Sequence, residues 1–145
     1  MGSVPHSLKL NAPVEITMIS IIKFDNFNSA VCNYNQILSK GFPHFISGNY
    51  GLGVGDAPYD NDCNIFSPNH TQLASQCGNG TFTTLPGNYL QLNKWYFLAT
   101  SISANNVINY QIIMDPLNKA LNMSQISNVN GSYNIGINSQ DISIG

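Results

Sequence analysis

The stretch KWYFLATSISANNVINYQIIM, residues 94–114, decides the fold class. It contains two runs of aromatic and β-branched residues, 94–103 and 107–114, joined by the polar turn sequence SANN. Neither run repeats its apolar residues at the three- or four-residue spacing of a helix. Runs of this length and composition around a short turn are typical of paired antiparallel strands. The stretch therefore predicts two neighbouring β-strands.

The same pattern recurs along the chain between clusters of Asn, Gly, Ser and Pro. In YGLGVGD, residues 50–56, apolar residues occupy one face and glycines the other, so another segment has to approach the glycine face closely. In ITMISIIKF, residues 16–24, both faces are largely apolar, which suits a strand that is covered on both sides or that faces a second sheet. The prediction is an all-β, two-sheet antiparallel sandwich, with further strands at 35–41 and 141–145.

The length and the charge of the chain exclude several classes of function. The 145 residues have room for one domain, 1–145, in which residues 1–6 are expected to be a tag or flexible lead-in. The five basic residues are all scattered lysines, while 21 residues are Asn, so no basic stripe could neutralise a phosphate backbone. No apolar run approaches the roughly 18 residues of a membrane span. We expect no nucleic-acid partner and no membrane span.

Three cysteines, Cys32, Cys63 and Cys77, allow one disulfide with one thiol left over, as is plausible for an exported protein. A bridge from Cys63 to Cys77 would close the long loop that is expected from Asp56 to about Gly80. The chain also carries four N-x-S/T sequons, at Asn69, Asn79, Asn122 and Asn130. These features favour a secreted or cell-surface location.

The loop GDAPYDNDCN, residues 55–64, holds three of the seven carboxylates: Asp56, Asp60 and Asp62. With Asn64 they could offer oxygen ligands to calcium, which needs six to eight. The loop is not an EF-hand, because Ile65 stands where that motif requires Gly and Thr71 where it requires Glu. A plain Pro/Asp/Asn turn explains the same residues, so a calcium site and a turn both remain open.

Catalysis is not expected. Glycosidases that retain configuration place two carboxyl groups about 5–5.5 Å apart. The chain has a single Glu, Glu15, with no second acid nearer than Asp25 and no E-x-D-x-x-E arrangement of acids. We predict that the protein is not an enzyme.

Aromatic residues fall into two groups. Trp95, Tyr96 and Phe97 lie in an uninterrupted apolar strand and are predicted to be core. Loop aromatics interleaved with Asn and Gly are the better candidates for stacking on a sugar, with nearby amides on its hydroxyls. The predicted ligand-binding residues are Tyr34, Phe45, Tyr59, Tyr89, Asn61 and Asn64.

The blocks IIKFDNF, NQILSKGFPHFISGNYGLGVGD, LQLNKWYFLATSIS, INYQIIMD and DISIG, in this order, resemble the laminin-G-like, concanavalin-A-like jelly rolls of secreted, multi-modular Bacteroidetes proteins. The resemblance spans about residues 7–145. It implies a jelly roll, a Cys32–Cys63 disulfide as the favoured pairing, and a calcium ion at the rim. The chain departs from the family at YQIIMDPLNKALN, where a short hairpin is usual, and it lacks the family's closing strand after residue 145.

The expected function is a non-catalytic, lectin-like carbohydrate-binding module of a secreted or cell-surface protein. The alternative is an adhesion or assembly module that binds protein by accepting a strand at an open sheet edge. The expected partner is accordingly a glycan or a surface protein, and calcium is the one cofactor considered.

Overall fold

The computed structural model describes residues 2–5, 7, 14–26, 34–41, 48–55, 72–77, 81–114, 125–130, 133 and 139–144. All regular structure in these residues is β-strand, so the all-β prediction is confirmed. The strands are β1 (Gly2–Val4), β2 (Glu15–Lys23), β3 (Tyr34–Lys40), β4 (Tyr50–Gly55), β5 (Gln72–Cys77), β6 (Thr81–Tyr89), β7 (Trp95–Ser103), β8 (Asn106–Met114), β9 (Gln125–Asn130) and β10 (Ile142–Ile144).

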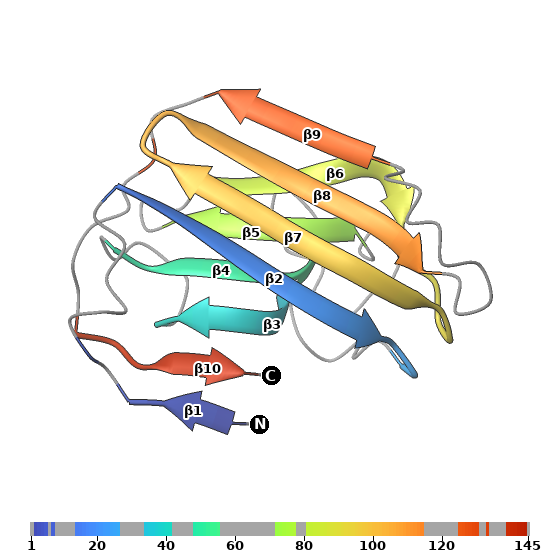
Figure 1. The fold of residues 1–145 in the computed structure, drawn as a ribbon, viewed down its shortest axis with the longest axis horizontal. Helices are drawn as coiled ribbons and strands as arrows, with labels where there is room; N and C mark the ends of the chain where they lie inside the picture. Colours follow the sequence, from blue (N-terminus) through green and yellow to red (C-terminus); the bar gives the residue numbers. More distant parts are fainter. Residues whose placement is uncertain are drawn as a thin grey trace.

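The strands form two antiparallel sheets packed face to face (Figure 1). One sheet has the order β1-β10-β3-β4-β5-β6 and the other the order β2-β7-β8-β9. The stretch that predicted the fold class supplies β7 and β8, which pair from Trp95 opposite Met114 to Ile102 opposite Val107. The predicted two-sheet antiparallel sandwich is therefore confirmed.

The core lies between the two sheets. Successive side chains of a strand point to opposite faces, so every second residue of β4 faces the core. These residues are Tyr50, Leu52 and Val54, each at most 2% exposed. Gly51 and Gly53, between them, are buried on the opposite face of β4. From the other sheet the core receives side chains of β2, β7 and β8: Met18, Tyr96, Leu98, Ile102 and Val107.

Ser75 and Asn109 form a buried polar contact between the two sheets. Ser75 Oγ of β5 donates a hydrogen bond of 2.9 Å to Asn109 Oδ1 of β8, and both residues are buried. A buried polar group that lacks a hydrogen bond is costly, so this bond favours one position of the two sheets relative to each other.

Strand β2 faces the second sheet with one of its two faces, which is one of the two alternatives predicted for it: Met18 is 2% exposed, while Ile19 and Ile21 on the outer face are 57% and 58% exposed. One prediction about the four-stranded sheet is wrong. Trp95 is 46% exposed and is not core, whereas Tyr96 is fully buried. Successive residues of a strand point to opposite faces, so the step from Trp95 to Tyr96 crosses from the outer face of the sheet to its inner face.

The two ends of the described chain lie side by side (Figure 1). Residues 2–4, expected to be a lead-in, form β1, and Gly2 stands opposite Ile144 of β10. Strand β10 also pairs with β3, with Ile142 opposite Lys40. The last described strand thus lies between the first strand and β3. The described residues contain no helix of the length and hydrophobicity needed to cross a membrane.

Candidate functional site

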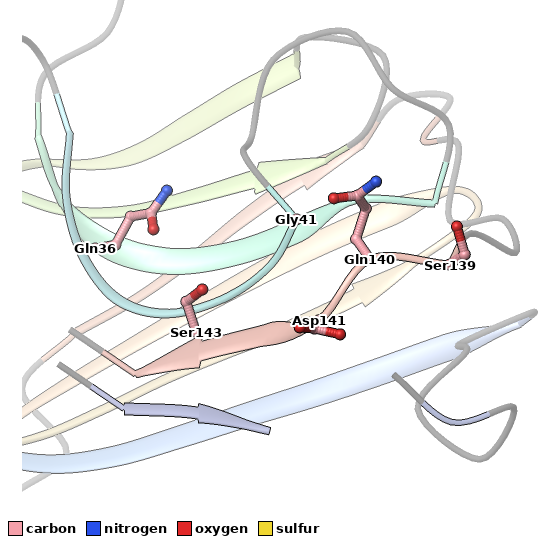
Figure 2. A pocket seen from close by; sticks show the side chains of 6 residues that line it. All are labelled: Gln36, Gly41, Ser139, Gln140, Asp141 and Ser143. Carbon is pink, nitrogen blue, oxygen red and sulfur yellow. The ribbon is translucent and has the colours of Figure 1, made fainter. Parts of the chain in front are cut away.

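A polar pocket of about 320 Å³ opens where β3 and β10 meet (Figure 2). Gln36 comes from β3, Ser143 from β10, and Gly41 directly follows β3. Figure 2 shows the Gln36, Ser143 and Gln140 side chains projecting from neighbouring segments toward the same side of the sheet. The described residues that line the pocket are Gln36, Gly41, Ser139, Gln140, Asp141 and Ser143.

A β-bulge in β3 shapes one wall of the pocket. The register against β4 shifts between Gln36 and Leu38. In a regular strand, residues three apart face opposite sides, but the extra residue of a bulge allows them to share a side. Ser39 Oγ consequently donates a 2.9 Å hydrogen bond to Gln36 Oε1, which fixes the orientation of the amide. Ser143 stands directly opposite Ser39 in the register of β10 with β3.

Gly41 closes the other wall. Its φ is 70°, in the left-handed region that favours glycine, and its N–H donates to the Asp141 carbonyl oxygen at 3.0 Å. A Cβ at this position would lie 2.5 Å from Oδ1 of Asn49, a residue that is itself fully buried. Gly41 thereby holds residues 139–141 against the end of β3 without a side chain of its own.

The lining chemistry suits a neutral, hydroxyl-rich ligand. Amide groups of Gln36 and Gln140 donate and accept hydrogen bonds, serine hydroxyls do both, and the Asp141 carboxylate accepts. Asp141 is the one charged residue among the described residues of the lining. A lone carboxylate does not make the carboxyl pair that a retaining glycosidase requires. The arrangement can bind through hydrogen bonds, and its described residues form no acid/base pair.

Most residues of the sequence-predicted site lie outside the described residues. This holds for the predicted calcium ligands, for Cys32 and Cys63, and for four of the six predicted ligand-binding residues, so these predictions stay predictions. The residues concerned are Asp56, Asp60, Asp62, Asn64, Asn61, Phe45, Tyr59, Cys32 and Cys63. Within the described ranges, no three His, Cys, Asp or Glu residues gather into a group that could hold a metal ion.

The structure does place three of the predicted residues. Tyr34 begins β3, two residues before Gln36, and pairs with Gly55. Tyr89 ends β6, is 41% exposed, and is separated from β10 by three intervening strands, so the pocket does not include it. Cys77 ends β5 opposite Tyr50 of β4, and β5 therefore interrupts the loop that was expected to run from Asp56 to about Gly80.

The pocket residues themselves were missed by sequence reasoning. Gln36, Asp141 and Ser143 are not among the residues that the sequence predicted for a binding or metal site. The sequence signal was weak, because the pocket depends on a pairing between β3 and β10 that joins residues about one hundred positions apart. The run SQD at residues 139–141, just before a short strand, was the one local cue.

Lys40, next to Gly41, is fully buried and stands opposite Tyr50 in β4. Burial lowers the pKa of the Lys40 ammonium from its ordinary value of 10.5. Burial also raises the pKa of the Tyr50 hydroxyl above its ordinary value of 10.0. The two groups therefore change stability in opposite directions at high pH.

The Lys40 effect can be isolated below pH 10. Between its lowered folded pKa and its ordinary value, the unfolded chain holds the Lys40 proton and the folded protein releases it, so stability rises with pH. We expect the free energy of unfolding of the wild type to rise relative to Lys40→Met as pH increases from about 7 to about 9.5. Urea unfolding at several pH values measures this, with the exposed Lys94→Met as control. Parallel pH profiles of wild type and Lys40→Met would contradict the expectation.

Comparison of the chain with family models, with curated proteins and with solved structures found no match. The case for a function therefore rests on the pocket and on the residues that form it.

Proposed function

We propose that the chain is a non-catalytic carbohydrate-binding module, with a jelly-roll sandwich, that belongs to a secreted or cell-surface protein. The observation that carries the proposal is the lining of the pocket between β3 and β10, where the described residues supply amide, hydroxyl and carboxylate groups and include no lysine. A sugar hydroxyl both donates and accepts hydrogen bonds, and the lining contains acceptors and donors that can pair with it in either role.

The charge of the pocket favours a neutral sugar over an anion. Asp141 would repel a phosphate, sulfate or uronate, and the described lining offers no cation to offset that repulsion. The same carboxylate accepts hydrogen bonds from two adjacent hydroxyls of a sugar ring, an arrangement stronger than a neutral hydrogen bond.

The dimensions favour a short ligand that binds weakly. A volume of about 320 Å³ lies at the lower end of the range for small-molecule sites. Ser139, Gln140 and Asp141 are exposed, so water competes for every hydrogen bond that they form. We expect one or two sugar units to bind, with a Kd on the order of 0.1–1 mM.

Substitutions in the pocket test the proposal. Neutral mono- and oligosaccharides would be screened by saturation-transfer NMR, with calcium and with chelator, because the loop at residues 55–64 is a predicted calcium site. For a sugar that binds, Asp141→Asn should weaken affinity about ten- to hundredfold through loss of a charge-assisted bond. Gln36→Ala should weaken it about three- to tenfold.

Gln91→Ala is the matched control for Gln36→Ala, because Gln91 is an exposed glutamine in the turn before β7 and does not line the pocket. The proposal fails if no neutral sugar binds, or if a bound sugar is indifferent to both pocket variants.

A further inference from the structure

Four of the described strands lie at sheet edges, and two of them resist pairing with another chain. Strand β1 has only three residues. Strand β6 contains Pro86, which has no N–H to donate, and its register against β5 is irregular. Strand β9 is an edge of regular register with six residues, three fewer than β2, and its last three residues, Asn128, Val129 and Asn130, are exposed. Short length, proline and irregularity are the usual protections of an edge strand.

Strand β2 has none of these protections. It has nine residues, lacks proline, and pairs with β7 without a break in register from Glu15 to Lys23. Among the described strands, β7 is its one neighbour, so the other edge of β2 carries a row of backbone groups without a strand partner. Its exposed face includes Ile19 and Ile21, both more than half exposed. An edge of this kind is a template for strand addition.

The order of residues along β2 identifies the occupant that fits. The outer face reads Glu15, Thr17, Ile19, Ile21, Lys23, with opposite charges at the two ends and Ile19 at the centre. A second β2 strand running antiparallel, with Ile19 opposite Ile19, brings Glu15 of each copy opposite Lys23 of the other. All nine residues overlap in this register. Opposite charges directly across an antiparallel pair are favourable, and like charges there are unfavourable.

We propose that two copies of this chain associate through β2, antiparallel about a two-fold axis at Ile19, so that one continuous sheet runs through both sandwiches. A two-fold interface uses the same surface of both copies, which the self-complementary sequence of β2 permits. This inference is independent of carbohydrate binding, because the pocket lies on the six-stranded sheet.

The energetic roles of the contacts differ. The edge backbone bonds and the paired isoleucines favour association, while the two ion pairs mainly select the register. Lys23 Nζ already lies 3.1 Å from Asp25 Oδ1, but the Asp25 side chain is 79% exposed. An exposed ion pair contributes little, so exchanging Asp25 for Glu15 of the other copy costs little.

Sedimentation velocity over a range of concentrations tests the association, with Ile19→Lys as the first variant. This change places two like charges opposite each other at the axis, with Cβ atoms about 4.5–5.5 Å apart, and should weaken dimerisation at least tenfold. Ile113→Lys is the matched control, because Ile113 is an exposed isoleucine of the same sheet on β8, away from the edge. It should leave dimerisation unchanged.

Charge reversal tests the register. Glu15→Lys and Lys23→Glu should each weaken the dimer, because each sets like charges opposite one another, and the double variant should restore it. Lys94→Glu, at an exposed lysine in the turn before β7, changes net charge as Lys23→Glu does and should have no effect. The proposal is overturned if the wild type stays monomeric up to about 1 mM. It is also overturned if Ile19→Lys has no effect, or if the double charge reversal does not restore association.

Discussion

Tyr96→Ala is expected to lower the free energy of unfolding by about 3–5 kcal/mol, the largest effect of any single change considered for this protein. The Tyr96 side chain is fully buried, and its ring lies 6.4 Å from that of Phe24, centroid to centroid. Its hydroxyl oxygen accepts a 2.9 Å hydrogen bond from the Gln91 N–H. Truncation therefore leaves a cavity and removes the partner of a backbone donor. Domains of this size have a total stability of about 5–15 kcal/mol, so the loss is a large fraction of it.

Urea unfolding measures the effect, and two variants serve as controls. Tyr96→Phe removes only the hydroxyl and should cost about 0.5–1.5 kcal/mol. Trp95→Ala, at the neighbouring and half-exposed residue, should cost about 1–2 kcal/mol because part of the indole already contacts water. A loss at Trp95→Ala as large as that at Tyr96→Ala would contradict the assignment of the two residues to opposite faces of β7.

Gly41→Ala is expected to have the second largest effect, a loss of about 2–4 kcal/mol. The estimate combines the cost of a left-handed backbone for alanine with the contact of its Cβ against Asn49. Because Asn49 is fully buried, its side chain has little room to move away. The change should also abolish sugar binding in the fraction that remains folded, since Gly41 holds Asp141 in the pocket.

The matched control is Gly2→Ala. A Cβ at Gly2 meets no atom within 4 Å, and its φ is not in the left-handed region. Urea unfolding and sugar titration of both variants separate a specific effect of Gly41 from a general effect of replacing glycine in this chain. Equal stability of the two variants would show that the turn after β3 tolerates a side chain.

Strands that carry long apolar runs were predictable from the sequence. The strands expected at residues 16–24, 94–103 and 107–114 match β2, β7 and β8 to within one residue at each end. Strands β5, β6 and β9 were missed for physical reasons. Their sequences QLASQC, TFTTLPGNY and QISNVN are polar or contain proline and glycine, so their strand structure depends on the neighbours with which they pair.

The site was less predictable than the fold. The lining joins Gln36 to Ser143 through the pairing of β3 with β10, and a bulge in β3 decides which way Gln36 faces. Neither the pairing nor the bulge has a local sequence signature. The error at Trp95 has a similar origin, because a continuous apolar run does not tell which of its two faces meets the other sheet.

The adjacency of the two ends of the described chain has a mechanical consequence. Gly2 and Ile144 are directly opposite each other at one end of the β1–β10 ladder. Tension applied through linkers at these two points would load the ladder at that end and open its hydrogen bonds one after another, as a zipper opens. When two strands are pulled along their length in opposite directions, all the hydrogen bonds between them share the load. The β1–β10 pair cannot share the load in this way, because both points of attachment are at the same end of the ladder. Under tension the β1–β10 pair would therefore separate at low force, while the strands that form the pocket and the core still hold.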